Sequence, residues 1–268
     1  MGYSQKLRGL FPEISLNWED ILLLETFQIK YLPDRVAMSE FSSLLRAYPV
    51  VQRFLISKYP PIAAFLRRIL EENQALEDRD LIEANCQEAL WEIADLIIYN
   101  KHPEQFDTHA PIKWDLSEIS AICSLDGKVI ADVGAGSGRI AFLVAPLAHT
   151  VFAVEPITSF RSFMKEKAIK NSVENLFVVD GTLDSLPLPD HSLDVLITSN
   201  AIAWNLEEEL KEIERVIKKG GYAIHLLQSN EQMENSFHET LSSSPWNYTC
   251  LQDENGEKMK LRYFKVNN

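Results

Sequence analysis

The amino-acid sequence predicts an α/β fold, in which an α-helical domain precedes a mostly parallel sheet that ends in an antiparallel β-hairpin. Residues 1–104 show helical hydrophobic periodicity, and no glycine lies between Leu10 and Gly127. From residue 105 to 268, short apolar strands alternate with amphipathic helices, the order typical of a parallel sheet covered on both faces. We therefore expect a helical domain over residues 1–104 and an α/β domain over residues 105–268.

Helical segments account for most of the expected first domain. Residues 18–29 and 41–48 are rich in apolar side chains, and Pro49 should end or kink the second segment because proline lacks an amide hydrogen. Pro60 and Pro61 should open a third helix. The strongest helical pattern covers residues 80–99, with apolar positions at Leu81, Ile82, Ala89, Leu90, Ile93, Leu96 and Ile97.

Five strands are expected in the second domain, over residues 128–132, 150–155, 176–180, 193–198 and 221–227. The clearest helix between them covers residues 206–219, where Leu210, Ile213, Val216 and Ile217 share one face and two glycines follow. Residues 246–252 and 258–266 flank a turn at residues 254–256 and should form a β-hairpin. The hairpin brings the expected sheet to seven strands.

Composition and charge indicate a soluble, cytoplasmic protein. The formal net charge is −13, and no dense basic run is present, which argues against a nucleic-acid acceptor. No apolar window reaches the ~20 residues of a membrane span, and no signal peptide is visible. Cys86, Cys123 and Cys250 lie far apart, so they predict neither a zinc site nor a disulfide framework and should pack as small hydrophobes.

A glycine-rich turn is the main functional motif. Gly134, Gly136 and Gly138 follow the first strand and precede a helix. Glycine lets the backbone approach a ligand closely, and the amide groups at a helix start favour an anionic group such as a carboxylate. The phosphate-binding pattern Gly-Lys-Ser/Thr is absent, since Arg139 and Ile140 follow Gly138. The dinucleotide pattern also fails, because Arg139 stands where its third glycine is required.

The spacing Asp-x-Gly-x-Gly-x-Gly, starting at Asp132, resembles motif I of the class I S-adenosylmethionine-dependent methyltransferases. Residues 181–195 are similar to the family's segment of a small residue, an acid, Leu-Pro and Asp-x-Ser-x-Asp. Residues 212–221 are similar to its helix and Gly-Gly turn before the fifth strand. The resemblance covers residues 128–227, and the hairpin extends it to the end. It implies a Rossmann-like fold, S-adenosyl-L-methionine as cofactor and S-adenosyl-L-homocysteine as product.

The resemblance also implies the positions that bind the cofactor. Glu155, which ends the second strand, should accept hydrogen bonds from the ribose hydroxyls. The adenine-side acid of the family falls on Thr182, so we divide that role between Asp180 and the pair Thr182 and Leu183. The full set of expected cofactor-binding residues is Asp132, Gly134, Ala135, Gly136, Gly138, Glu155, Pro156, Asp180, Gly181, Thr182, Leu183 and Asn200.

The catalytic residues and the acceptor are left open. Many relatives place a histidine before an aromatic residue after the fourth strand, whereas this chain has Ala203 and Trp204. We interpret Trp204 as core or pocket wall and His225 as a structural histidine. Neither an Asn/Asp-Pro-Pro-aromatic motif for amino groups nor a Pro-Cys nucleophile is present, and no Asp/His cluster predicts a metal.

Three hypotheses remain for the function. The first is methylation of a small-molecule acceptor, with the helical domain as a cap that selects it; such a cap is an analogy with the family. The second is methylation of a protein or an RNA, although the acidity of the chain argues against RNA. The third is a non-catalytic protein that binds the cofactor for interaction with a partner. The sequence does not indicate an oligomeric state.

Overall fold

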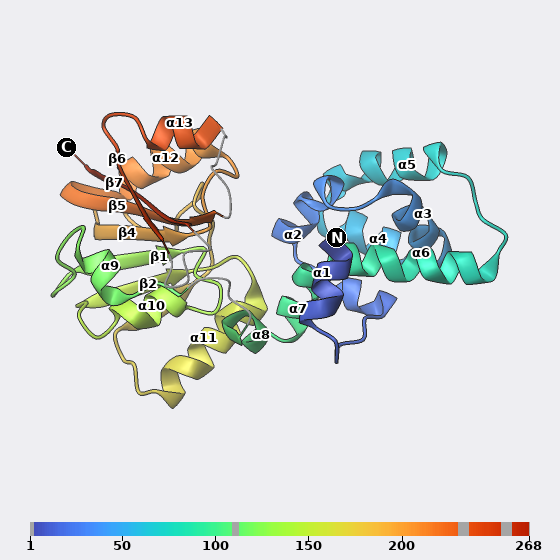
Figure 1. Cartoon of the computed structure of the whole chain (residues 1–268), viewed down its shortest axis with the longest axis horizontal. Coiled ribbons are helices and arrows are strands. Elements are labelled where there is room, and N and C mark those ends of the chain that lie inside the picture. The colour runs from blue at the N-terminus through green and yellow to red at the C-terminus, as the bar shows by residue number, and fades with distance from the viewer. Residues whose placement is uncertain (1–2, 109–112, 230–235, 253–258, 268) are drawn as a thin grey trace. The chain divides into compact units, whose positions relative to one another are not determined.

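The computed structural model describes residues 3–108, 113–229, 236–252 and 259–267. The chain divides into two compact units, Met1–His109 and Ala110–Asn268. The first unit is helical and the second is an α/β unit built on one sheet (Figure 1).

Short helices make up the first unit. They are α1 (Tyr3–Leu10), η1 (Trp18–Leu23, a 3-10 helix), α2 (Thr26–Lys30), η2 (Leu32–Asp34), α3 (Met38–Ala47), α4 (Pro49–Lys58), η3 (Pro60–Ile62), α5 (Ala63–Glu72), α6 (Arg79–Glu92), α7 (Ala94–Lys101) and α8 (Glu104–Thr108). Pro49 ends α3 as expected and occupies the first turn of α4, where a main-chain amide has no acceptor within the helix, so that proline's missing amide hydrogen costs nothing. Pro60 opens the short η3 helix that leads into α5.

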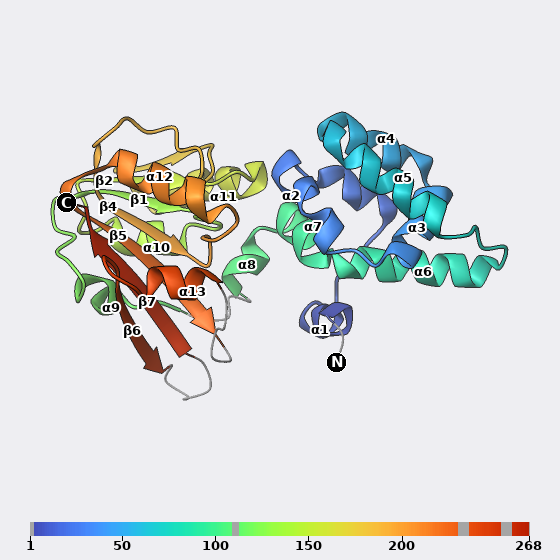
Figure 2. The ribbon, with the colours of Figure 1, turned by 90° about the horizontal axis from the view of Figure 1, so that it is seen from above.

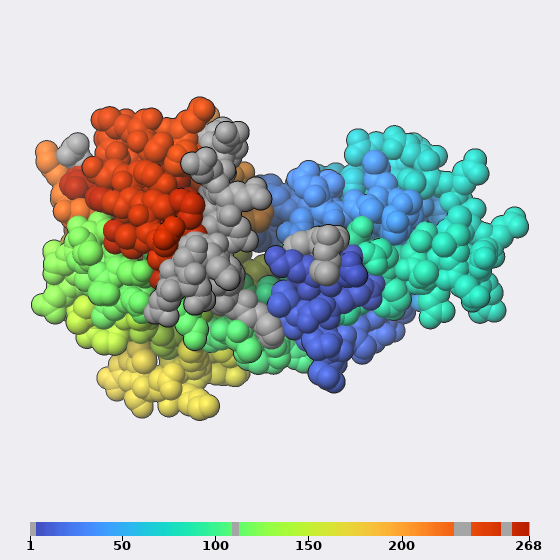
Figure 3. Space-filling model, viewed as in Figure 1, coloured from blue at the N-terminus to red at the C-terminus, as the bar shows by residue number. Residues whose placement is uncertain are grey.

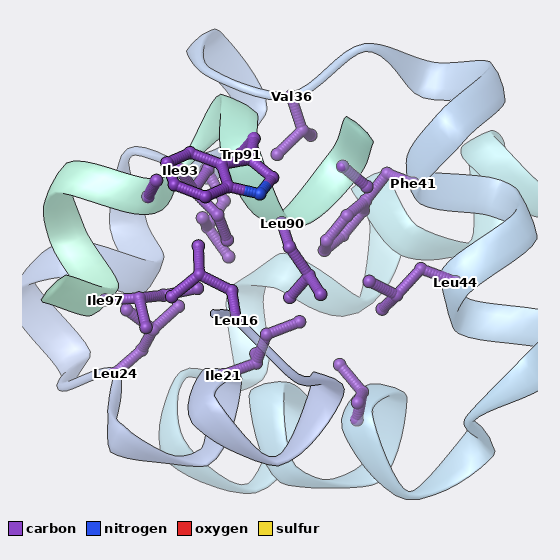
Figure 4. Packing of buried hydrophobic residues seen from close by; sticks show 14 of the residues in the cluster. Leu16, Ile21, Leu24, Val36, Phe41, Leu44, Leu90, Trp91, Ile93 and Ile97 are labelled. Carbon is purple, nitrogen blue, oxygen red and sulfur yellow. The ribbon is translucent and has the colours of Figure 1, made fainter. Parts of the chain in front are cut away.

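A continuous apolar core holds these helices together (Figure 4). Phe41 and Leu44 of α3 pack toward Leu90 of α6, and Leu16 and Ile21 of the preceding segment close the same core. Trp18 stacks on Tyr48 with ring centroids 5.0 Å apart. Burial of a large apolar side chain contributes roughly 1.5–3 kcal/mol, so packing in this core stabilises helices that are too short to be stable in isolation.

The single helix expected over residues 80–99 is wrong in one respect. The backbone leaves helical geometry at Ile93, where φ is −116° and ψ is 18°, and this residue separates α6 from α7. Leu81, assigned to the buried face, is 46% exposed. Hydrophobic periodicity records which side of a helix is buried, but it does not detect a break of one residue that preserves the buried side.

The second unit contains a seven-stranded sheet in the order β3-β2-β1-β4-β5-β7-β6. Its strands are β1 (Val129–Val133), β2 (Thr150–Val154), β3 (Leu176–Val179), β4 (Leu193–Ser199), β5 (Ile217–Ser229), β6 (Asn247–Gln252) and β7 (Met259–Val266). Strands β1 to β5 are parallel, and β7 and β6 are antiparallel at the outer edge (Figure 2). The predicted fold class, including the hairpin, is confirmed; the turn predicted at residues 254–256 lies outside the described residues.

Helices cover both faces of the sheet (Figure 1). Apolar residues of α10 (Arg139–Val144) and α11 (Thr158–Lys170) share one core with Val151 and Ile197, and the outer side of α11 forms part of the molecular surface (yellow in Figure 3). Residues of α12 (Leu206–Val216) and α13 (Ser236–Leu241) share the opposite core with Leu196 and Ala223. The short helix α9 (Leu116–Ser120) precedes β1.

The helix predicted over residues 206–219 ends at Val216, because its next residue already belongs to β5. Ile217 pairs with Leu193 of β4, and its carbonyl accepts a hydrogen bond from the Asn267 side chain at 2.8 Å. These partners lie far away in the sequence, so the local sequence does not reveal them. Ile217 is apolar because it is buried in the sheet, although its spacing also fits the apolar face of the helix. Tertiary pairing has overridden the local helical pattern here.

The structure also bears on the expectations for membrane spans and for the cysteines. Among the described residues, no helix combines the length and the apolar character needed to cross a bilayer. The expectation that all three cysteines pack as small hydrophobes is wrong for Cys250, which is exposed on the edge strand β6, whereas Cys86 is buried and Cys123 is half-buried.

Candidate functional site

Three turns lie together at the carboxyl edge of the parallel sheet. They follow β1, β2 and β4, which are adjacent in the order β2-β1-β4. In an open α/β sheet, ligands bind outside the carboxyl ends of the strands, where the strand order reverses. This edge therefore defines the candidate site, and most of the residues predicted from the sequence lie on its three turns.

The glycine turn requires glycine for two reasons. Gly134, Gly136 and Gly138 have φ values of 69°, 55° and 80°, which L side chains rarely adopt. A Cβ on Gly134 would also overlap the Cβ of Ala201, and one on Gly138 would lie 2.9 Å from Sδ of Met164. The turn is thus packed closely against the segment after β4 and against α11.

The amide groups of this turn donate mainly within the protein. The amides of Gly134 and Ala135 both donate to the carbonyl of Val154, at 2.9 and 3.1 Å, and the amide of Gly138 donates to the carbonyl of Ala135 at 2.8 Å. The sequence had suggested amide groups available to an anionic ligand. The structure instead indicates that the glycines serve the shape of the turn and the close approach of a ligand.

Asp132 is buried at the end of β1 and holds the start of the following helix. Its Oδ2 accepts a hydrogen bond from the amide of Ala141 at 2.8 Å. Burial raises the pKa of Asp132 to about 7, and the charge of Glu155 adds to the rise, whereas the Ala141 amide and Arg139 oppose it. The capping role considered from the sequence is therefore present.

Glu155 joins the ends of β1 and β2. Its Oε2 accepts from the amide of Gly136 at 2.8 Å, and its Oε1 accepts from the amide of Ile157 at 2.9 Å. The side chain is buried. A buried carboxylate satisfied by two main-chain donors is well ordered, so Glu155 fixes the glycine turn against the strand next to it. Pro156, between Glu155 and Ile157, is half-buried.

Arg161 of α11 is a residue that the sequence analysis missed. Its guanidinium donates to the carbonyl of Glu155 at 2.8 Å, to Oδ1 of Asp180 at 3.1 Å and to Oγ1 of Thr158 at 2.9 Å. The Asp180 side chain is 71% exposed and pairs with this arginine. Arg161 therefore ties together the ends of β2 and β3.

The predicted cofactor-binding residues in the segment after β3, apart from Asp180, each have a structural role. Gly181 packs against Pro187, since a Cβ there would lie 2.7 Å from Cδ of the proline. Oγ1 of Thr182 donates to Oδ1 of Asp184 at 2.6 Å. Leu183 is buried in the core that faces α12. Its side chain is consequently committed to packing, and only the backbone of this residue remains to meet a ligand.

Residues 186–190, which carry the second part of the motif, are fastened to α12. The amide of Leu186 donates to Glu212 at 3.0 Å, and Arg215 donates to the carbonyls of Leu186 and Leu188 at 3.1 and 2.9 Å. Arg215 also pairs with Asp190 at 2.7 Å. The two motif segments quoted from the sequence are therefore partners in the fold.

The turn after β4 contains two residues with a left-handed backbone. Asn200 is exposed with φ of 53°, and its amide donates to the carbonyl of Leu226 at 2.9 Å. Ala203 has φ of 79°. Trp204 follows and is 52% exposed, so it does not occupy the core position considered from the sequence, and its place on a pocket wall stays a prediction.

His225 is fully buried in β5, as expected of a structural histidine. Its Nδ1 shares a hydrogen bond of 2.8 Å with Oγ1 of Thr198, and its ring lies 5.1 Å from that of Trp246. Burial, with the nearby Lys265, lowers the pKa of His225 to about 3. The ring is therefore neutral at physiological pH and does not carry a proton between groups.

Comparison with known proteins agrees with this geometry. Residues 131–225 match a family described as "Methyltransferase domain". An uncharacterized methyltransferase, YcgJ, from Bacillus subtilis is 29% identical over 38% of this chain and 41% of its own length. A malonyl-[acyl-carrier protein] O-methyltransferase from Marinomonas is 27% identical over 50% of this chain and 52% of its own length. The chain thus spans about half the length of these curated relatives.

A solved structure shows the same fold. A SAM-dependent methyltransferase from Aquifex aeolicus superposes with a TM-score of 0.50 and 16% identity, over 61% of this chain and 98% of that one. The sheet order and the superposition show a Rossmann-like fold, and residues 131–225 of the second unit match the methyltransferase-domain family. The resemblance to S-adenosylmethionine-dependent methyltransferases is confirmed.

Proposed function

We propose that this protein transfers the methyl group of S-adenosyl-L-methionine to a small-molecule acceptor. The observation that carries the proposal is the position of Glu155, whose buried carboxylate lies between the glycine turn after β1 and the start of α11. A ligand that follows the carboxyl edge of the sheet from β1 toward β3 must pass this carboxylate.

The described residues fit the cofactor along that path. Gly136 offers a position without a side chain, at which the methionine part can approach the backbone. The carboxylate of Glu155 has the chemistry that two adjacent ribose hydroxyls require of a hydrogen-bond acceptor. Residues 180–183 would face the adenine, with Asp180 exposed and Leu183 offering its backbone. Asp132 would add negative charge near the cationic methionine part in its ionised form.

The chemistry needs little more than alignment from this chain. When bound, S-adenosyl-L-methionine would supply an activated methyl group on its sulfonium, which a lone pair of the acceptor would take while the sulfur keeps the electron pair of the broken carbon–sulfur bond. The protein must hold the acceptor in line with that bond and exclude water, because effective alignment contributes several kcal/mol. We propose that Asn200 and Trp204, on the turn after β4, help to position the acceptor.

The acceptor is expected to react without a proton acceptor from this turn. Residues 200–205 contain neither histidine nor a carboxylate, and Ala203 stands where many relatives carry histidine. A carboxylate, a neutral amine or a thiolate needs no base before attack. The Marinomonas relative is named for O-methylation of a malonyl group carried by an acyl-carrier protein, and a malonyl carboxylate is a nucleophile of this type. We propose that the helical unit of residues 1–104 selects the acceptor.

Isothermal titration with S-adenosylmethionine and S-adenosylhomocysteine, with NAD as control, tests the proposal. We expect micromolar binding of both sulfur nucleosides and no binding of NAD. Glu155→Gln keeps the size but removes the charge, and should weaken binding by about 10- to 100-fold, since hydrogen bonds to a charged acceptor contribute about 1.5–3 kcal/mol. Glu166→Gln, at an exposed position on α11, is the matched control and should bind as the wild type does.

The outcomes separate the three hypotheses. Binding followed by methyl transfer to members of a small-molecule panel supports the proposal. Methyl transfer to proteins or RNA alone would replace the small-molecule acceptor by a macromolecule. Tight binding without turnover on any acceptor would favour the non-catalytic, interaction-based function. Equal affinity of Glu155→Gln and the wild type would overturn the assignment of the ribose site.

A further inference from the structure

A buried carboxylate outside the motif residues holds the turn after β4. Glu209, in the first turns of α12, is 2% exposed. Its Oε2 accepts from the amide of Ala203 at 2.7 Å, and its Oε1 accepts from the amides of Trp204 and Asn205 at 3.0 and 3.1 Å. Three consecutive main-chain donors therefore converge on one side chain.

This arrangement offsets a local backbone strain. Ala203 has φ of 79°, a conformation that costs a residue with a Cβ roughly 1–2 kcal/mol. Alanine does not favour this conformation by itself, so the surrounding contacts must maintain it. The three hydrogen bonds to Glu209 begin at this residue, and they turn the chain so that Trp204 is presented at the surface.

We propose that Glu209 is a positioning residue, which fixes the turn after β4 so that Trp204 forms an ordered aromatic wall for the methyl acceptor. The acceptor role of the wall rests on the proposed methyltransferase function, whereas the fixing of the turn does not. Glu209 would act entirely through the main chain of residues 203–205. It would neither contact the cofactor nor exchange a proton with the acceptor.

Cofactor binding should be independent of this device. The earlier part of the same turn is held by other contacts, namely the hydrogen bond from the Asn200 amide to Leu226 and the packing of Ala201 against Gly134. Loss of the Glu209 contacts should therefore loosen residues 203–205 and leave the glycine turn intact. This separation distinguishes a positioning role from a general structural one.

The substitution Glu209→Gln tests the proposal, because the amide group of glutamine presents N–H to donors that need an acceptor. The matched control is Glu208→Gln, an exposed neighbour on the same helix that pairs with Lys211. Tryptophan residues labelled with 5-fluorotryptophan give one fluorine signal each, and Trp204→Phe identifies that of Trp204. Hydrogen exchange of the amides of residues 203–205 provides a second measurement. Carried out on the wild type alone, it already supports or contradicts the positioning role.

We expect the fluorine signal of Trp204 to shift or broaden in Glu209→Gln while the other tryptophan signals stay in place. Exchange of the three amides should accelerate about tenfold or more, consistent with the loss of hydrogen bonds to a charged group. Glu208→Gln should change neither. The affinity for S-adenosylhomocysteine should remain within about threefold of the wild type, since the cofactor contacts are elsewhere.

Two results would overturn the positioning role: rapid exchange of these amides in the wild type, or an unchanged Trp204 signal in folded Glu209→Gln. If Glu209→Gln does not fold, the wild-type exchange measurement decides. Failure of the wild type to bind S-adenosylhomocysteine, with protected amides at residues 203–205, would reject the proposed function and leave the positioning role supported. If acceptor turnover in Glu209→Gln equals that of the wild type although the turn is loosened, Trp204 is not an acceptor wall.

Discussion

Replacement of Asp132 by asparagine should stabilise the free protein while it weakens cofactor binding. Asp132 is buried, and its ionised form is disfavoured there, as its pKa of about 7 shows. Asparagine retains an oxygen that can accept the hydrogen bond from the Ala141 amide. The substitution therefore removes the charge and preserves the cap at the start of α10.

The size and the sign of the effect follow from the shift in pKa. The folded-state pKa lies about three units above the ordinary value of 3.8, and each unit corresponds to about 1.4 kcal/mol. The folded state binds a proton that the unfolded state has lost between these values. The contribution of Asp132 to stability is therefore complete below about pH 4 and is lost as the pH rises through about 7, by a total of about 4 kcal/mol.

Urea unfolding of the full chain between about pH 4.5 and 8 measures the free energy of unfolding. Hydrogen exchange of peptides from β1 then reports the stability of the second unit separately. We expect Asp132→Asn to gain stability relative to the wild type as the pH rises, and to bind S-adenosylhomocysteine more weakly than the wild type above about pH 7, where Asp132 is ionised. A stability difference that does not change with pH would refute the buried-charge argument. Unchanged binding would remove Asp132 from the cofactor site.

Two further perturbations test other parts of the structure. Gly138→Ala places a methyl group 2.9 Å from Sδ of Met164 at a positive φ, and should lower the free energy of unfolding, measured by thermal melts, by about 1–3 kcal/mol. The matched control is Gly127→Ala, which has a positive φ but open space around it and should lose only about 1 kcal/mol. Equal losses in the two variants would contradict the packing argument. A chain of residues 105–268 should fold and bind S-adenosylhomocysteine but lose acceptor turnover, as measured by titration and by methyl transfer. Full turnover in that chain would refute the selection role of the helical unit.

Strands were the most predictable part of the fold. The five parallel strands lie close to their expected positions because a strand buried on both faces reads as a short apolar run between turns. The end of α12 could not be predicted in the same way. Ile217 continues the apolar face of the helix in sequence, and only its pairing with Leu193 assigns it to β5.

The candidate site was predictable where the backbone imposes a residue type. The glycines at 134, 136 and 138 are required by positive φ, so their spacing is visible in the sequence. Glu209 was missed because it acts on main-chain atoms, which leave no residue pattern at the other end of the contact. Arg161 was missed because its partners Glu155 and Asp180 become its neighbours only through the fold. Glu209 is one of three consecutive glutamates, and only burial distinguishes it from its exposed neighbours.

Three buried carboxylates share one task at the carboxyl edge of the sheet. Asp132, Glu155 and Glu209 accept main-chain amides at the start of α10, at the turn after β1 with the start of α11, and at the turn after β4. Each turn is consequently ordered before a ligand arrives, which reduces the entropy lost on binding. The proposed cofactor carries a sulfonium and an ammonium group, and it is chemically matched to an edge at which three carboxyl groups are concentrated.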